Sequence, residues 1–242
     1  MVSGGKPRQN IAKPAARMLG STNILIPRAE AVKTPFHVAV EGNIGAGKSS
    51  VLSLLESFED LEINPEPIDT WRNFQGHNLL QLMYQHPEKH TFAFQTAVQL
   101  SRCVELARNS AKEVRIFERT LDSSRFVFSE FAYNERNLSD HELAIIQAWY
   151  TQLKQNLPPI GLYIYLRSSP EVVLNRIKTR GREEEANIDI EFLTKLHRLH
   201  EEWLMNERHG PLGAKLLVIN ADQTQEKIKK QLLENMNLIK GL

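Results

Sequence analysis

The chain has 242 residues, of which 41% are hydrophobic and 24% charged, and its formal net charge at pH 7 is +1. This length suits one α/β domain or at most two small ones, and the near-zero charge gives no electrostatic case for nucleic acids or membrane surfaces as partners. The single cysteine, Cys103, excludes an internal disulfide and is compatible with a reducing compartment, and no apolar run is long enough for a membrane span.

Basic residues are concentrated at the start of the chain. Residues 1–34 contain six Lys or Arg residues and one acid. An acid-poor leader of this kind is typical of a mitochondrial transit segment, although three prolines interrupt any amphipathic helix, and a disordered basic tail explains the composition equally well. We therefore expect a leader over residues 1–34, a folded domain over residues 35–242, and a mitochondrial or cytosolic location.

The first element of the domain is an apolar run beginning at Phe36, which predicts a buried strand. It leads into Glu41-Gly-Asn-Ile-Gly-Ala-Gly-Lys-Ser49, which contains the P-loop pattern G-x-x-x-x-G-K-[ST]. Glycines allow successive backbone amides to point inward at a phosphate, and a helix N-terminus adds its positive end. Lys48 supplies charge for the outer phosphates and the Ser49 hydroxyl can ligate Mg²⁺. The alternative is a glycine-rich turn without a ligand. The predicted phosphate site comprises Gly42, Asn43, Ile44, Gly45, Ala46, Gly47, Lys48 and Ser49.

Strands and helices alternate through the rest of the chain. We expect strands over 61–65, 114–118, 162–166 and 215–219, and helices after the P-loop to about residue 58 and over 79–85, 92–110 and 190–207. A capping box, Ser139-x-x-Glu142, opens one further helix, Ser169-Pro170 another, and Asp222 the last. This alternation predicts an α/β fold with a five-stranded parallel sheet covered by helices on both faces.

The helix over 92–110 carries two stripes with helical spacing. The apolar stripe is predicted to face the core and comprises Ala93, Ala97, Leu100, Val104 and Ala107. The opposite face carries Gln95, Val98 and Arg102.

Polar residues follow the first three strands, where a parallel sheet places its ligands. Glu66 could take a proton from an acceptor hydroxyl that attacks a γ-phosphate, although an isolated Glu is more often a surface acid. Glu118 could support Mg²⁺ and Arg119 could hold the acceptor or the phosphate, with an ordinary ion pair as the alternative.

A basic run, Arg176-Ile-Lys-Thr-Arg-Gly-Arg182, predicts a mobile lid over the phosphates. The alternative is a solvated face balanced by the glutamates at 183–185. Trp71 and Phe128 could stack on an organic acceptor and Gln95 offers a paired donor and acceptor, but aromatic side chains usually pack in cores.

Taken together, these residues resemble those of the deoxyribonucleoside kinases. The similarity covers roughly residues 36–222 and is carried by seven segments: the P-loop, Pro65-Glu-Pro67 with Trp71-Arg-Asn, Asn78-Leu-Leu-x-Leu-Met-Tyr84, Phe94-Gln-Thr96, Phe117-Glu-Arg119, Tyr163-x-Tyr-Leu-Arg167 with Ser169-Pro-Glu171, and Leu196-His-x-x-His-Glu-x-Trp203.

The resemblance implies a P-loop kinase, usually a homodimer, that phosphorylates the 5′-hydroxyl of 2′-deoxynucleosides with ATP or another triphosphate and Mg²⁺. By matching position, Glu66 would be the general base, Arg119 would bind near the 5′-hydroxyl, and Lys48 would serve the phosphates. Ser49 and Glu118 would support the metal, and Arg176, Arg180 and Arg182 would form the lid. The remaining substrate contacts would be Trp71, Tyr84, Gln95, Val98, Arg102, Ser124, Phe128 and Glu185, with Tyr84 and Glu185 on the 3′-hydroxyl.

The chain departs from the family pattern at two positions that bear on specificity. Thymidine-accepting members resemble each other in having Met at position 102 and Ala at position 124, whereas deoxycytidine- and purine-preferring members have Arg and Asp. This chain has Arg102 with Ser124. An unpaired Arg102 beside a small Ser124 leads us to expect broad acceptance of nucleosides, pyrimidines included.

Two other functions compete with this one. A nucleoside monophosphate kinase needs cationic groups for the acceptor's phosphate, and Glu66 would repel that phosphate. A switch GTPase is disfavoured because the Asp-x-x-Gly signature after the third strand and the Asn-Lys-x-Asp signature are absent. A silent nucleotide-binding regulator is disfavoured because it should have lost its base or its arginine, and this chain keeps both Glu66 and Arg119.

Overall fold

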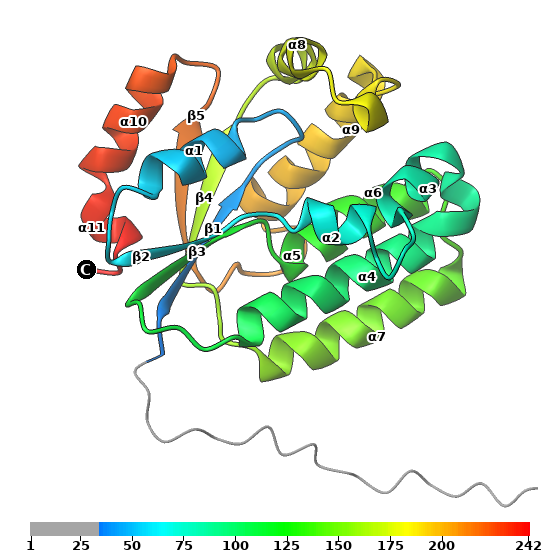
Figure 1. Cartoon of the computed structure of the whole chain (residues 1–242), viewed down its shortest axis with the longest axis horizontal. Helices are drawn as coiled ribbons and strands as arrows, with labels where there is room; N and C mark the ends of the chain where they lie inside the picture. The colour runs from blue at the N-terminus through cyan, green and yellow to red at the C-terminus, as the bar shows by residue number, and fades with distance from the viewer. Residues whose placement is uncertain (1–33) are drawn as a thin grey trace, which may run out of the picture. The chain divides into compact units, whose positions relative to one another are not determined.

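The computed structural model describes residues 34–242, apart from the side chain of Glu183. Within this range five strands form one all-parallel sheet in the order β2-β3-β1-β4-β5 (Figure 1). The strands are β1 (Phe36–Glu41), β2 (Leu61–Asn64), β3 (Val114–Glu118), β4 (Leu162–Arg167) and β5 (Lys215–Asn220). The predicted α/β class and five-stranded parallel sheet are therefore confirmed. Residues 1–33, nearly all of the predicted leader, lie outside the described residues, and the proposed domain boundary stays a prediction.

Helices cover both faces of the sheet. One face packs against α1 (Lys48–Leu55), α10 (Gln225–Glu234) and α11 (Met236–Ile239), with α8 (Pro170–Arg180) joining the same apolar cluster. The other face packs against the carboxyl end of α4 (Pro87–Ala107), the π-helix η1 (Ser124–Ser129), α9 (Ile190–His200) and the π-helix η3 (Glu201–Met205). Smaller elements complete the chain: α2 (Ile68–Arg72), α3 (Leu79–Gln85), α5 (Leu121–Ser123), α6 (Glu130–Asn134), α7 (Asp140–Asn156) and the 3-10 turn η2 (Glu183–Glu185).

The central strands are buried on both faces, as parallel strands between two helical layers should be. Every residue of β3 is buried, and β1 is buried from His37 onward. In β1, the side chains of Val38 and Val40 join the cluster under α1, whereas Ala39 joins the cluster under α9. Because both faces of β1 pack against apolar side chains, its sequence is a run of apolar residues and not an alternation of apolar and polar ones.

The strand register brings the chemically interesting loops together. Val40 of β1 pairs with Glu118 of β3, and Asn64 of β2 pairs with Phe117. Because all three strands are parallel, the P-loop after β1, Glu66 after β2 and Arg119 after β3 emerge from the same edge of the sheet.

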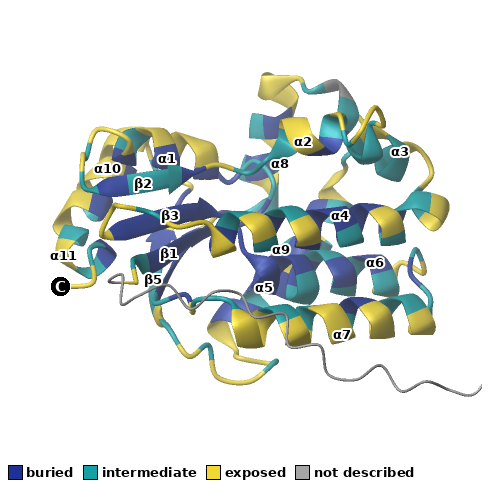
Figure 2. Ribbon diagram, turned by 60° about the horizontal axis from the view of Figure 1, so that its bottom comes forward, coloured by how far each residue is buried: buried dark blue, intermediate teal, exposed yellow. Residues whose placement is uncertain are grey.

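The predicted core stripe of the long helix is wrong. Leu100 and Val104 have 53% and 63% of their surface exposed, and Ala93 and Ala107 are exposed as well, so that Ala97 alone of the five is buried. The buried face is instead the one that carries Gln95, Val98 and Arg102. On α7, Ile145 and Trp149 are also exposed, and Figure 2 shows exposed stripes along both helices.

Of the three predicted helix-capping signals, two are confirmed and the third is wrong. The capping box of Ser139 and Glu142 and the start of α8 at Ser169-Pro170 are confirmed. Asp222 does not cap α10, whose N-cap residue is Thr224; its carboxylate instead accepts hydrogen bonds from the Ser168 hydroxyl and the Ser169 amide. Among residues 34–242, no helix combines the length and apolar character that crossing a membrane requires.

Candidate active site

The P-loop needs its glycines for two separate reasons. Gly42, Gly45 and Gly47 all have positive φ, at +144°, +77° and +97°, where other residues are strained. In addition, a Cβ on Gly42 would lie 2.7 Å from the Leu166 carbonyl oxygen, and one on Gly45 would lie 2.9 Å from that of Val173. The loop is thus wedged between β4 and α8, with its amides leading into the N-terminus of α1.

Lys48 is held inside the loop that precedes it. Its Nζ donates to the carbonyl oxygens of Gly42 at 3.3 Å and Asn43 at 2.9 Å. Burial, aided by the charge of Arg119, lowers the pKa of Lys48 to about 8. An anion beside this ammonium would favour its charged form, so the position suits a phosphate.

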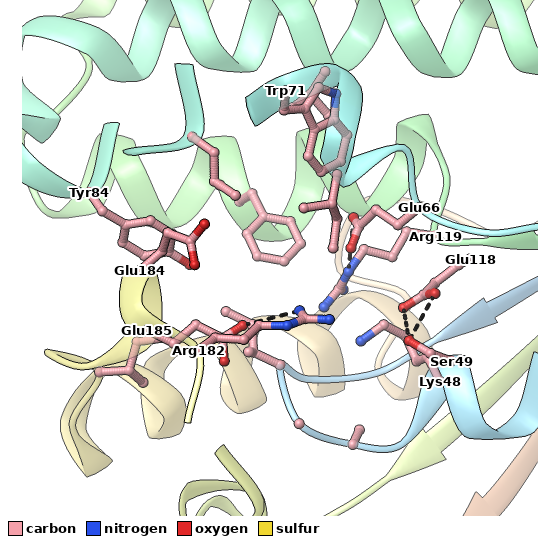
Figure 3. A pocket seen from close by; sticks show the side chains of 18 of the residues that line it. Lys48, Ser49, Glu66, Trp71, Tyr84, Glu118, Arg119, Arg182, Glu184 and Glu185 are labelled. Carbon is pink, nitrogen blue, oxygen red and sulfur yellow. Dashed lines mark hydrogen bonds and ion pairs between the residues drawn. The ribbon is translucent and has the colours of Figure 1, made fainter. Parts of the chain in front are cut away.

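A hydroxyl and a carboxylate meet at the mouth of the loop. Ser49 Oγ lies 3.2 and 3.3 Å from the two carboxylate oxygens of Glu118 (Figure 3). Within residues 34–242 no group of three or more His, Cys, Asp or Glu side chains is arranged for a metal ion. Two oxygen-bearing side chains nevertheless suit Mg²⁺, which commonly takes one or two protein oxygens and completes its shell with phosphates and water.

Glu66 is the centre of an ionic cluster. Its Oε1 lies 2.6 Å from Nη2 of Arg102 and 3.5 Å from Nε of Arg119. Burial pushes the pKa of Glu66 upward, but the positive charges of Arg119, Arg102 and Lys48 outweigh it and hold the pKa below its usual value. Glu66 is therefore ionised at neutral pH, although it lies in the wall of a cavity.

Arg119 is fixed by its backbone and by an aromatic ring. Its φ is +67°, and its amide donates to the Val40 carbonyl at 3.1 Å, which continues the β1–β3 pairing by one residue. The guanidinium lies 4.6 Å from the centre of the Phe128 ring, and Nη1 is 3.9 Å from Oε2 of Glu41. Glu41 is fully buried, and burial raises its pKa to about 7 despite the nearby Arg119.

The charged groups described above, apart from Glu41, line one cavity of about 800 Å³. Among the predicted site residues, Gly42 and Asn43 do not line the cavity, and every other one does. Those that line it are Ile44, Gly45, Ala46, Gly47, Lys48, Ser49, Glu66, Trp71, Tyr84, Gln95, Val98, Arg102, Glu118, Arg119, Ser124, Phe128, Arg176, Arg180, Arg182 and Glu185.

The far end of the cavity is aromatic and sparsely polar. Trp71 packs edge-on against Phe94 with ring centres 5.6 Å apart, and its Nε1 donates to Ser101 Oγ at 3.0 Å. Gln95 is buried, and its amide makes no hydrogen bond to any residue in the described part of the chain. Burial, followed by the charge of Glu185, raises the pKa of Tyr84 and keeps its hydroxyl protonated.

All three predicted lid arginines already have partners within the chain. Arg180 Nη2 lies 2.5 Å and Arg182 Nη1 3.5 Å from the carboxylate of Glu185. Arg182 and Glu185 are seen together in Figure 3, between Tyr84 and Lys48. Arg176 donates to the carbonyl oxygens of Ala221 at 2.7 Å and Ala46 at 3.5 Å, so it ties α8 to the P-loop.

The predicted unpaired state of Arg102 is wrong. Its Nε donates to Ser124 Oγ at 3.0 Å, its Nη1 to the Glu118 carbonyl at 3.0 Å and its Nη2 to Glu66. The Ser124 hydroxyl thus accepts the hydrogen bond from Arg102 Nε that an aspartate carboxylate at this position could accept. Sequence reasoning considered only the missing acid.

Sequence reasoning also missed part of the cavity wall. Arg72 and Glu184, which pair at 2.8 Å and join α2 to η2, line the cavity. A further group extends the cavity past the P-loop and comprises Ser50, Val51, Leu54, Gln223, Gln225 and Ile228. The segment 223–228 follows the last strand, so the rule that ligands lie beyond strand ends could have found it.

Comparison with known proteins gives a consistent result. The profile of the family "Deoxynucleoside kinase" matches residues 38–239. The chain is 36% identical over 203 residues to mitochondrial thymidine kinase 2 of Homo sapiens, covering 84% of this chain and 77% of that one. It is 39% identical over 196 residues to deoxycytidine kinase of Rattus norvegicus (70% and 75% covered), and 36% identical over 230 residues to deoxycytidine kinase 2 of Gallus gallus (81% and 86% covered).

Proposed function

The chain belongs to the deoxynucleoside kinase family, and on that premise we propose how its cavity is divided between two substrates. The predicted activity is confirmed: the protein is a deoxynucleoside kinase, which transfers a phosphoryl group from ATP to the 5′-hydroxyl of a 2′-deoxynucleoside. The assignment of individual residues to steps is our proposal. The observation that carries it is that Lys48 of the P-loop and the carboxylate of Glu66 line the same cavity.

The donor occupies the P-loop end. Its phosphates lie against the amides of residues 42–49 and the Lys48 ammonium, at the N-terminus of α1. Arg180 and Arg182 of the lid close over them from the opposite side. The nucleobase of the donor extends toward Gln223 and Gln225, whose amides can each donate and accept a hydrogen bond.

The acceptor lies between Glu66 and the aromatic end. Glu66 accepts the proton of the 5′-hydroxyl as that oxygen attacks the γ-phosphorus, and the bond to the bridging oxygen breaks so that ADP leaves with the electron pair. Arg119 holds the transferring group by hydrogen bonds. Gln95 pairs with the nucleobase, Trp71, Val98 and Phe128 enclose it, and Tyr84 and Glu185 hold the 3′-hydroxyl.

Ser49 and Glu118 would hold Mg²⁺ beside the donor phosphates. Bound there, the metal would neutralise charge on the β- and γ-phosphates. EDTA should abolish turnover and added Mg²⁺ restore it; activity that survives chelation would remove the metal from the proposal.

We also propose that a wide range of deoxynucleosides is accepted, pyrimidines included. Arg102 is held against the wall by Ser124 and the Glu118 carbonyl, which leaves Gln95 as the polar group facing the base. An amide offers one donor and one acceptor and can meet either a pyrimidine or a purine edge.

Steady-state kcat/KM for the four deoxynucleosides tests this range. We expect the four values to lie within about 1000-fold of each other, which corresponds to roughly 4 kcal/mol of transition-state discrimination. A preference above that ratio for one nucleoside would contradict broad acceptance. Turnover of nucleoside monophosphates in place of nucleosides would contradict the acceptor site itself.

A homodimer is proposed through the exposed faces of α4 and α7. Leu100 and Val104 on α4 and Ile145 and Trp149 on α7 are large apolar side chains that one chain alone leaves in water.

The compartment, mitochondrial or cytosolic, is proposed on the composition of residues 1–34 and the similarity to a mitochondrial relative. Imaging of a reporter fused to residues 1–34 tests it, and a reporter that stays outside mitochondria would exclude transit.

A further inference from the structure

Arg102 is a buried cation in the cavity wall that contacts both Trp71 and the proposed base, Glu66. Its side chain is 6% exposed, and it lies 5.6 Å from the centre of the Trp71 ring. Three acceptors contact the guanidinium: Ser124 on η1, the backbone of Glu118 at the end of β3, and Glu66 after β2. The first two define where the guanidinium sits, independently of Glu66.

The two oxygens of Glu66 are in different situations. Oε1 lies 2.6 Å from Arg102 and 3.5 Å from Arg119, whereas no residue in the described range 34–242 donates a hydrogen bond to Oε2. The carboxylate is 16% exposed and lines the cavity. One oxygen is thus anchored and the other is free to accept a proton.

We propose that Arg102 is a positioning residue for Glu66: it anchors Oε1 so that Oε2 faces the acceptor hydroxyl, and its charge sets the pH above which Glu66 works as a base. This inference rests on the proposed role of Glu66. A hydrogen bond of 2.6 Å to a charged donor is among the stronger contacts available to a carboxylate.

Every charged or titratable group facing Glu66 bears on its protonation. Arg102 approaches from α4, Arg119 from the loop after β3 and Lys48 from α1. Tyr84 of α3 is also within electrostatic reach, and its own pKa is raised partly by Glu66. Removal of Arg102 leaves Arg119 and Lys48 in place, so Glu66 should lose part of its stabilisation as an anion.

The test is the pH profile of kcat/KM in the Arg102→Met enzyme, measured with saturating Mg·ATP and a deoxynucleoside whose base does not titrate between about pH 5 and 9. We expect the acid limb to move upward by at least about one pH unit, because an opposite charge this close typically shifts a carboxyl by one to three units. The ratio of wild-type to variant kcat/KM should therefore be about tenfold larger at low pH than at high pH.

Two further variants keep the experiment decisive. Arg102→Lys retains the charge without the planar fork and should show a smaller shift in the same direction. Arg125→Met removes another partly buried arginine that pairs with a glutamate, Glu130 at 3.0 Å, and lies outside the cavity wall; its acid limb should match the wild type. A loss of activity in Arg102→Met and Arg102→Lys that is the same at every pH would overturn the proposal.

The outcome also separates this inference from the proposed function. If Glu66→Gln is inactive and the acid limb of Arg102→Met does not move, Arg102 has a merely structural role and Glu66 remains the base. If Glu66→Gln is fully active, the base assignment fails, and the inference about Arg102 fails with it.

Discussion

At the scale of single residues, burial decides which charges this protein tolerates. His37 of β1 is 2% exposed and packs edge-on against Phe117, with ring centres 5.3 Å apart. Neither ring nitrogen has a hydrogen-bond partner in the described chain. Burial, reinforced by the positive charge of Arg115, lowers the pKa of His37 to about 4.

His37 should therefore make the protein sensitive to acid. Its pKa is 6.5 in the unfolded chain and about 4 in the folded one, so its contribution to stability is complete above pH 6.5 and is lost as pH falls toward 4. The loss corresponds to about 3 kcal/mol. Between pH 7 and 4, the free energy of unfolding of His37→Phe should fall by about 3 kcal/mol less than that of the wild type. Urea titrations measure this difference.

A second histidine provides the control for that comparison. His77 is exposed, and His77→Phe should leave the pH dependence of the wild type in place. If His37→Phe and the wild type lose stability in parallel on acidification, the buried neutral histidine is not the cause.

Single residues also show what sequence reasoning can and cannot reach. Lys48 and Glu66 are predictable because a loop motif and a strand end fix where they lie. The partners of Arg102 are not, because Glu66 is 36 residues away along the chain and Ser124 is 22. A side-chain pairing of that kind depends on tertiary distances, which periodicity and spacing do not encode.

At the scale of elements, α4 shows how an amphipathic pattern can mislead. Its apolar stripe has helical spacing, and sequence alone assigns such a stripe to the core. In this helix the face that carries Gln95 and Arg102 is buried and lines the cavity, whereas most of the apolar stripe is exposed on the surface. The two π-helices η1 and η3 also escape prediction, since a single widened turn leaves no periodic signal.

The exposed stripe predicts a specific effect on assembly. Val104→Glu places a charge in the proposed dimer face, where its desolvation would oppose association. We expect the variant to sediment as a monomer at concentrations where the wild type is a dimer. Leu233→Glu alters a similarly exposed apolar side chain on α10 and should leave the dimer intact. A wild-type chain that sediments as a monomer would contradict the interface.

At the scale of the whole molecule, the parallel sheet explains how the two proposed substrate sites come to lie in one cavity. Alternating strands and helices are enough to predict five parallel strands, and the fold places three strand ends at one edge. The order β2-β3-β1-β4-β5 does not follow from that alternation, because several strand orders are compatible with it. The order matters, since it sets β1 directly beside β3 and brings Arg119 to the P-loop.

The most direct test of the account is the turnover of Glu66→Gln, measured beside Glu130→Gln. Glu130 has a similar exposure, 19% against 16%, also pairs with an arginine and lies outside the cavity wall. We predict that kcat of Glu66→Gln falls at least about 100-fold, the contribution typical of a general base, with little change in the KM for the nucleoside, while Glu130→Gln retains its kcat. A Glu66→Gln enzyme with wild-type kcat would contradict the claim that Glu66 accepts the proton of the attacking hydroxyl.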